Sequence, residues 1–298
     1  MKIHMPVMKE EALTHLGPLK EDSLFLDGTL GMGGHTEAFL SCFPGLRAVG
    51  VDADPVMLDR ARLRLAPFGG RFQGFNAWTD EFMRGYPLSE KPDRILLDLG
   101  ISTFHYEGSG RGFSFAADEP LDMRLADGEG ESAADILASQ DEKALADIFF
   151  NFGEERYSRR IAREVVRGRT EKHIGSAKEF ADIVRRSVPP SYRHGRLHPA
   201  TRCFQALRIA VNNELERLDR ALPLALELLP EAGRLGVISF HSLEDRRVKT
   251  CFRERAASGA WTLLTRKALK PTEEELQKNP ASRSARFRVI EKKKEGAP

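Results

Sequence analysis

The chain has 298 residues, of which 41% are hydrophobic and 30% are charged, and its formal net charge is +2. This length allows one large α/β domain or a core that carries a second module. No apolar run approaches the roughly 18 residues of a membrane helix, and the first residues lack the basic-then-apolar pattern of a signal peptide. We therefore expect a cytoplasmic protein without a membrane partner.

The N-terminal part alternates short apolar runs with helix-like segments, which is typical of a parallel α/β sheet. Strands are predicted at 24–27, 47–52, 71–75 and 93–98, and helices at 35–43 and 55–66. Pro55 stands in the favoured first turn of the second of these helices.

The pattern changes after residue 107. Residues 132–196 have helical periodicity without a convincing buried strand. One long amphipathic helix is predicted from apolar residues that step by three and four: Phe204, Leu207, Val211, Leu215, Leu218 and Leu222. Pro223 is expected to kink this helix or to start a new turn. A fifth strand at 235–240, a closing hairpin from 261–266 and 286–290, and a frayed tail at 291–298 follow. These segments predict a helical domain at 108–205, inserted into a core made of residues 1–107 and 206–298.

A glycine-rich turn at 27–35 joins the first predicted strand to the following helix. Such a turn presents backbone N–H groups to a ligand, because glycine permits close approach and positive φ. Asp52 ends the second strand, at the distance expected for an acid that holds the hydroxyls of a ribose. This arrangement predicts a site for a nucleoside cofactor, with a purely structural glycine turn as the alternative.

The residues of this turn favour S-adenosylmethionine over a dinucleotide. Thr36 stands where the G-x-G-x-x-G spacing requires a glycine, and residues 27–35 contain no lysine or arginine for a phosphate. Asp27 suits a sulfonium cation and would repel a pyrophosphate, although a turn-stabilising aspartate is the alternative. Phe75 or Trp78 is expected to stack on the adenine.

Asp98 ends the fourth strand, where open α/β sheets place their ligands. We expect it to lie beside the donor methyl group, where it could accept an N–H hydrogen bond from an amine substrate; a contact with the cofactor alone is the alternative. The three cysteines, Cys42, Cys203 and Cys251, predict reduced, mostly buried thiols, with no metal site and no cysteine nucleophile. Aromatic residues that could hold a base are Phe104, Tyr106, Phe113, Phe115 and Phe240.

Two polar clusters and a basic stretch have no place in this scheme. Residues 239–246 follow the fifth strand, and helix capping by Ser242 explains part of them but leaves His241 without a structural reason. Residues 198–202 precede the long helix. Between 154 and 208, lysine and arginine outnumber acids about two to one, which favours a nucleic-acid partner or, equally, a solvated helix face.

Together these segments resemble the bacterial ribosomal RNA small-subunit methyltransferase H family. The matching stretches, in the order of the family, are 4–8, 27–35, 98–102, 111–115, 120–124, 153–156, 198–212, 238–246 and 279–288. The resemblance implies a class I (Rossmann-like) methyltransferase core with an inserted helical domain for substrate recognition. It also implies methylation of the N4 amine of a cytosine in the decoding region of 16S rRNA, within the small ribosomal subunit. The sequence leaves open whether the protein is a monomer or a homodimer.

The resemblance further implies cofactor contacts, which are carried over to Gly33, Gly34, His35, Asp52, Trp78, Asp98 and His105. Phe75 is the alternative to Trp78, and His105 stands where the family usually has glutamine. Asp98 is expected to orient both donor and amine, and the insert to contact RNA phosphates through Arg156, Arg159, Arg160 and Arg202. Ala281 and Ser282 depart from an N-P-R-A-R-S pattern of the family. A dinucleotide-dependent oxidoreductase and a non-enzymatic assembly factor are the alternative functions.

Overall fold

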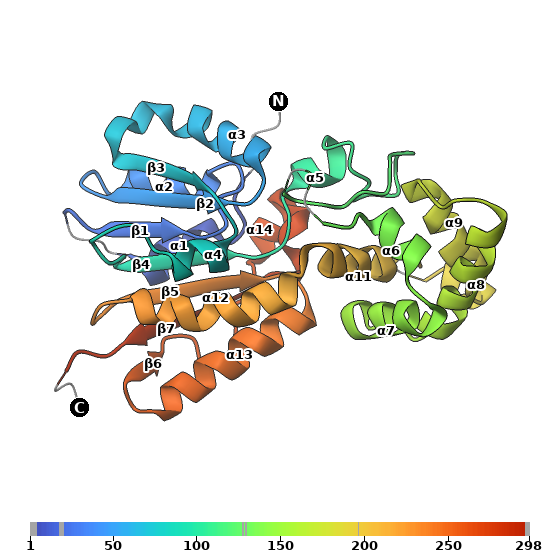
Figure 1. The fold of residues 1–298 in the computed structure, drawn as a ribbon. Coiled ribbons are helices and arrows are strands. Elements are labelled where there is room, and N and C mark those ends of the chain that lie inside the picture. Colours follow the sequence, from blue (N-terminus) through green and yellow to red (C-terminus); the bar gives the residue numbers. More distant parts are fainter. Residues whose placement is uncertain (1–4, 18–20, 127, 129, 196, 296–298) are drawn as a thin grey trace. The chain divides into compact units, whose positions relative to one another are not determined.

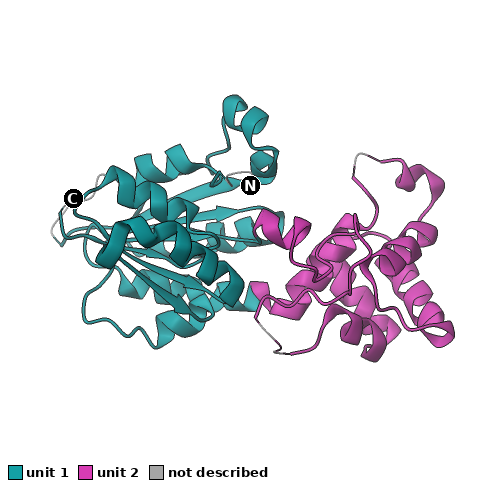
Figure 2. Cartoon of the chain, turned by 90° about the horizontal axis from the view of Figure 1, so that it is seen from above, with its two compact units in different colours: residues 1–101, 215–298 teal, residues 102–214 magenta. Residues whose placement is uncertain are grey.

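The computed structural model describes residues 5–17, 21–126, 128, 130–195 and 197–295. The chain forms two compact units (Figure 2): unit 1 comprises residues 1–101 and 215–298, and unit 2 comprises residues 102–214. Unit 2 is one continuous stretch that interrupts unit 1 in sequence, and it extends beyond the predicted insert at both ends. No helix of the described stretches is long and apolar enough to cross a membrane.

Unit 1 contains a seven-stranded sheet with the order β3-β2-β1-β4-β5-β7-β6 (Figure 1). Its strands are β1 (Leu24–Asp27), β2 (Arg47–Asp52), β3 (Phe72–Asn76), β4 (Arg94–Asp98), β5 (Arg234–Ser239), β6 (Trp261–Leu263) and β7 (Arg286–Lys292). The pairs among β1 to β5 are parallel, and β7 is antiparallel to both β5 and β6. From β1 the chain adds β2 and β3 on one side of the sheet and then β4 and β5 on the other side. The order of the strands thus reverses between β1 and β4, and a doubly wound sheet binds its ligand at such a point.

Helices cover both faces of this sheet, and for that reason its inner strands are apolar throughout rather than alternating. The helices that pack on one face are α1 (Lys9–Leu16), α2 (Gly34–Cys42) and α3 (Pro55–Leu65). Those that pack on the other face are α4 (Thr79–Arg84), α12 (Glu214–Leu228) and α13 (Ser242–Ala257). The remaining elements of unit 1 are α14 (Glu273–Lys278) and the 3₁₀ turns η1 (Ala66–Arg71) and η2 (Pro280–Ser284).

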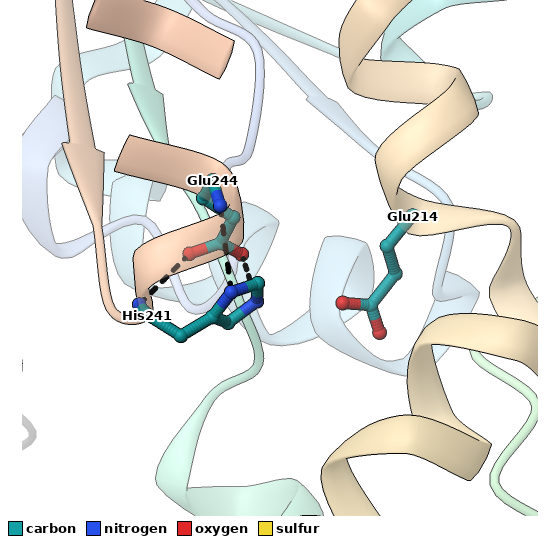
Figure 3. A group of neighbouring side chains, drawn as sticks. All are labelled: Glu214, His241 and Glu244. Carbon is teal, nitrogen blue, oxygen red and sulfur yellow. Dashed lines mark hydrogen bonds and ion pairs between the residues drawn. The ribbon is translucent and has the colours of Figure 1, made fainter. Parts of the chain in front are cut away.

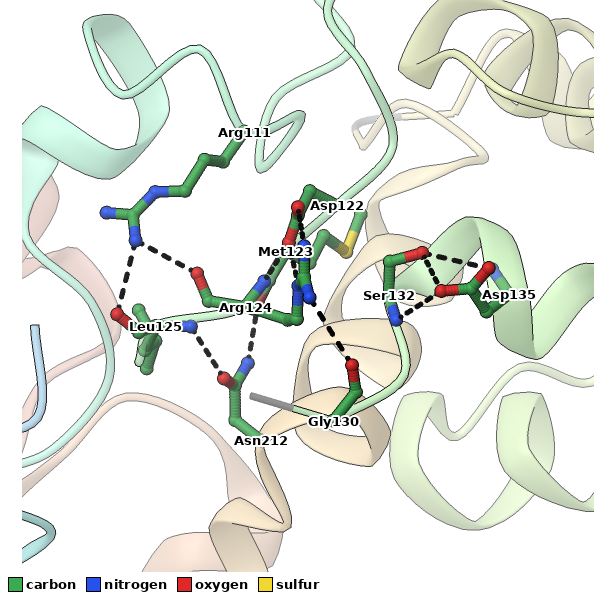
Figure 4. A network of polar contacts seen from close by, with 9 residues as sticks. All are labelled: Arg111, Asp122, Met123, Arg124, Leu125, Gly130, Ser132, Asp135 and Asn212. Carbon is green, nitrogen blue, oxygen red and sulfur yellow. Dashed lines mark hydrogen bonds and ion pairs between the residues drawn. The ribbon is translucent and has the colours of Figure 1, made fainter. Parts of the chain in front are cut away.

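Unit 2 is helical, as its periodicity predicts. Its helices are α5 (Thr103–Glu107), α6 (Ala133–Ser139), α7 (Glu142–Gly153), α8 (Ser158–Glu171), α9 (Ala177–Ser187), α10 (Pro190–Arg193) and α11 (Thr201–Asn212). The buried faces of α7, α8, α9 and α11 form its core, with Phe149 and Phe180 fully buried. The loop before α6 is fixed by polar contacts (Figure 4): Asn212 binds the backbone of Met123 and Leu125, and Arg111 donates to the carbonyls of Arg124 and Leu125.

The prediction of a single long helix through residues 204–222 is wrong. The chain forms two helices, α11 and α12, with a break at Asn213, whose φ is 50°. Asparagine tolerates the left-handed conformation that ends a helix. Pro223 lies within α12. The apolar spacing continues across the one-residue break, so periodicity alone did not reveal it.

The C-terminal strands pair antiparallel as predicted, but β7 also pairs with β5, so the two strands are not a simple hairpin. β7 runs to Lys292, and the tail predicted to fray from residue 291 therefore begins later. Residues 296–298 lie outside the described stretches. The cysteine prediction is wrong for Cys42, which is exposed, whereas Cys203 is buried and Cys251 is intermediate.

Candidate cofactor and methyl-transfer site

The glycine turn has the backbone conformation that its sequence predicts. Gly31 and Gly33 have φ values of 53° and 76°, and a Cβ on Gly33 would lie 3.0 Å from a Leu65 methyl carbon. Gly33 is the N-cap of α2 and offers no side chain to the first helical N–H groups. These donors have no acceptor within the helix, so they can bind a ligand at this end of α2.

Asp27 stabilises the turn from inside. The residue is 1% exposed, and its carboxylate accepts hydrogen bonds from the Thr36 hydroxyl at 2.8 Å and the Thr29 N–H at 3.3 Å. Burial raises the pKa of this carboxyl, against the opposing effects of His35 and of the two hydrogen bonds. These contacts match the alternative in which Asp27 stabilises the turn, and they do not support a role in facing the sulfonium.

Asp52 connects the second strand to the turn. Its Oδ2 accepts the N–H of Gly31 at 2.7 Å, and its Oδ1 accepts the N–H of Asp54 at 2.8 Å. Each carboxylate oxygen has a second lone pair, so both oxygens can still accept hydroxyl groups. Burial raises the pKa of Asp52 to about 7, although these two hydrogen bonds favour its charged form.

This raised pKa predicts pH-dependent cofactor binding. Ribose hydroxyls donate to the ionised carboxylate, so binding should tighten as pH rises through about 7 and release a proton below it. We expect the Kd for S-adenosylmethionine to be about tenfold lower at pH 8 than at pH 6, as measured by calorimetry in two buffers of different ionisation enthalpy. An Asp52→Asn variant should bind more weakly and lose this dependence. A wild-type Kd that is constant over this range would contradict the prediction.

The raised pKa of Asp52 has the opposite effect on the stability of the protein without cofactor: stability falls as pH rises. Without cofactor, the folded state retains the proton of Asp52 to a higher pH than the unfolded state does. The contribution of Asp52 to the free energy of unfolding therefore falls between about pH 4 and pH 7.

Asp98 and His35 meet at the carboxyl end of β4. The His35 Nε2 and the Asp98 Oδ2 are 3.5 Å apart, and the side chains are 6% and 22% exposed. Asp98 Oδ1 and both ring nitrogens of His35 are buried and have no hydrogen-bond partner among the described residues. Buried polar groups are normally paired, so these atoms mark the place of a polar ligand. The residues present therefore fit a cofactor at this point.

Glu275 of α14 is a further acid near this pair, and the sequence analysis missed it. Its Oε1 accepts the N–H of Met8 at 2.6 Å, and it interacts electrostatically with His35 and Asp98. Asn279 donates to the carbonyl of Met5 at 3.2 Å. Segments from the two ends of the chain are thus joined beside the glycine turn. A contact over such a sequence separation leaves no local pattern, so only the tertiary structure reveals it.

The two candidate adenine aromatics have different surroundings. Phe75 is partly buried and packs against the core, with its ring centroid 5.0 Å from that of Phe82. The Arg217 guanidinium lies 4.0 Å from the centre of the Trp78 ring and pairs with Asp80. The cation–π contact with Arg217 covers one face of the indole and holds Trp78 in place.

The structure gives two of the predicted histidines local roles. His105 is 4% exposed, and its Nδ1 accepts the N–H of Ser102 in the capping box of α5. His241 is the N-cap of α13 in place of the expected Ser242: its Nδ1 accepts the N–H of Glu244 at 3.4 Å, and the Glu244 carboxylate accepts the N–H of His241 (Figure 3). Glu214, also drawn there, pairs with Arg208 at 2.8 Å. Capping of α13 therefore explains the presence of His241, for which the sequence alone gave no structural reason.

The four arginines proposed for RNA lie in unit 2. Arg159 and Arg160 are exposed at the start of α8. Arg156 lies 4.9 and 4.7 Å from the ring centres of Tyr157 and Tyr192. Arg202 donates to the Glu154 carbonyl at 3.0 Å. Arg156 and Arg202 are therefore positioned by neighbouring groups, whereas Arg159 and Arg160 extend from the helix surface.

The sheet order, the antiparallel β7 between β5 and β6, and an acid as the last residue of both β2 and β4 define a class I S-adenosylmethionine-dependent methyltransferase. The family model described as "MraW methylase family" matches residues 1–293. The chain belongs to this family, and its cofactor is S-adenosylmethionine.

Relatives named "Ribosomal RNA small subunit methyltransferase H" align over nearly the whole chain. The protein from Treponema denticola is 53% identical in an alignment of 306 positions, gaps included, that covers 97% of each chain. The protein from Leptospira interrogans is 47% identical over 280 residues, which cover 92% of this chain and 84% of the relative. Among solved structures, an rRNA methylase from Streptococcus thermophilus aligns with 96% of this chain and 95% of its own, with 12% identity and a TM-score of 0.43.

Proposed function

We propose that the protein methylates the exocyclic N4 amine of a cytosine in the decoding region of 16S rRNA, within the small ribosomal subunit, in the cytoplasm. The names of its relatives support ribosomal RNA of this subunit as the substrate. The observation that carries the chemistry is the buried Oδ1 of Asp98 at the carboxyl end of β4, which has no hydrogen-bond partner within the described part of the chain.

Asp98 provides the acceptor that an exocyclic amine requires. The lone pair of the N4 nitrogen is conjugated into the pyrimidine ring and is a poor nucleophile. A hydrogen bond from this N–H to Asp98 Oδ1 orients the amine and shifts electron density onto the nitrogen. When bound, the cofactor supplies an electrophilic methyl group, and the rest of catalysis is positioning.

Other residues hold the cofactor in this proposal. Gly33, Gly34 and His35 contact it through the start of α2, and Asp52 accepts the ribose hydroxyls. Trp78 stacks on the adenine, with Phe75 as the alternative, and His105 is a further candidate contact. The test is methyl transfer to unmodified small subunits, followed by mass analysis of the nucleosides. N4-methylcytidine is the expected product, and binding without transfer by the wild-type protein would favour an assembly factor.

We propose further that unit 2 docks on the phosphates of the RNA through Arg156, Arg159, Arg160 and Arg202. Binding to small subunits should then weaken steeply with salt. An Arg159→Gln/Arg160→Gln variant should lower the slope of log K against log salt by about 0.7–0.9 for each contact that is lost. Arg253→Gln, which changes an exposed arginine of α13 in unit 1, is the control and should leave the slope unchanged. A flat salt dependence of the wild-type protein would remove unit 2 from phosphate binding.

A further inference from the structure

Two segments that the methyl-transfer chemistry does not use meet in unit 2. Phe115 belongs to residues 111–115, and His198 belongs to residues 198–202. The two rings are stacked, with their centroids 4.3 Å apart and their planes 26° apart. His198 is exposed, whereas Phe115 is only partly so. The imidazole thus lies over a phenyl ring at the surface of unit 2.

This pair is the outer end of a column of aromatic rings. Phe204 contacts Phe115 edge-on at 5.2 Å, Phe180 contacts Phe204 at 5.5 Å, and Phe149 contacts Phe180 at 5.9 Å. Phe204 is 5% exposed, and Phe180 and Phe149 are 0% exposed. Because the inner rings belong to the core, Phe115 has a fixed support, and the plane of the His198 ring is set in advance of any binding.

The surroundings of His198 suit a flat, neutral ring. Its Nδ1 accepts the N–H of Ala200 at 3.2 Å, which fixes the orientation of the ring and leaves the proton on Nε2. Burial lowers the pKa of His198, with a further contribution from Arg185, while Asp182 opposes it. The neighbouring Leu197 is 54% exposed.

We propose that the outer face of His198 is a stacking platform for one unpaired base of the RNA substrate. This inference rests on the proposed function, because it takes the RNA of the small subunit as the partner. Aromatic rings with cations nearby hold single-stranded bases by stacking, and a base has the flat surface that matches an imidazole fixed on Phe115. The exposed Arg185 and Arg186 at the end of α9 supply positive charge for the adjoining phosphates.

Two substitutions of the same residue separate the ring from its hydrogen bond. His198→Phe retains a ring for stacking but loses the acceptor for the Ala200 N–H. His198→Asn retains a side-chain acceptor close to the backbone but loses the ring. We expect His198→Asn to raise the KM for unmodified small subunits about 5- to 100-fold, with little change in kcat, and His198→Phe to stay within a few-fold of wild type.

Four further measurements make this test decisive. Thermal unfolding and S-adenosylmethionine affinity should be unchanged in both variants, and His173→Ala, which changes another exposed histidine of unit 2, should retain the wild-type KM. Equal effects of the Phe and Asn variants, or a wild-type KM for His198→Asn, would overturn the proposal. Filter binding to small subunits provides a readout without catalysis: weakened binding of His198→Asn would support the platform even if the wild-type protein transferred no methyl group. Weakened binding of His198→Asn to whole small subunits, together with wild-type binding to protein-free 16S rRNA, would point to a protein partner and contradict the proposal.

Discussion

Replacing Asp98 by asparagine is expected to slow methyl transfer to small ribosomal subunits by about 10²- to 10⁴-fold. The carboxylate stands at the carboxyl end of β4. One of its oxygens lies 3.5 Å from His35 Nε2, and the other has no hydrogen-bond partner among the residues that the structure describes. An asparagine of nearly the same size keeps the shape of the site but replaces one acceptor oxygen by a donor NH₂ group, which cannot accept the amine N–H. The rate is measured by transfer of labelled methyl groups under single-turnover conditions.

The control for Asp98→Asn is Asp59→Asn, which makes the same chemical change at an exposed position of α3. That variant should transfer methyl groups at the wild-type rate. Cofactor affinity, measured separately, shows how much of the loss in Asp98→Asn arises from binding. A rate within threefold of wild type would exclude Asp98 from the methyl-transfer step.

A Gly112→Ala substitution is expected to destabilise unit 2 by about 3 kcal/mol or more. Gly112 has a φ of 70°, and a Cβ there would lie 2.3 Å from the carbonyl oxygen of Pro120 and 3.1 Å from the Cα of Leu121. These are backbone atoms, so the strain cannot be relieved by a side-chain rotation. Urea unfolding, followed by hydrogen exchange of the amides in unit 2, measures the loss.

Gly110→Ala is a matched control, because Gly110 has a φ of 68° but no atom within 4 Å of an added Cβ. It carries the same backbone penalty, on the order of 1–2 kcal/mol, without the collision. Equal losses in the two variants would show that the approach of Pro120 to Gly112 does not matter for stability.

Much of unit 1 could be predicted because its signals are local. Short apolar runs that end in Asp27, Asp52 and Asp98 give both the strands and the edge at which the cofactor site forms. The turn at Gly33 is visible because glycine adopts the left-handed conformation without the strain that most side chains would cause. The break at Asn213 was missed because the apolar spacing on either side continues as if the helix were unbroken.

The parts that sequence could not supply depend on distant contacts. Glu275 reaches Met8 across almost the whole chain, and no periodicity or spacing indicates that pairing. The sequence also did not indicate that Asp27 is buried within the turn, because an aspartate at this position could equally face the ligand. The stacking of His198 on Phe115 joins two segments that were noticed separately but could not be related.

The position of β5 and β7 in the sheet has a consequence for synthesis of the protein on the ribosome. Strand β4 is bordered by β5, which is made only after the whole of unit 2 has been translated. At typical elongation speeds of about 5–20 residues per second, β4 waits on the order of ten seconds for its neighbour. Unit 2, being continuous, can fold during this interval, while the exposed edge of β4 is open to wrong pairing. The edge of β4 that ends in Asp98 is therefore paired only when β5 has left the exit tunnel.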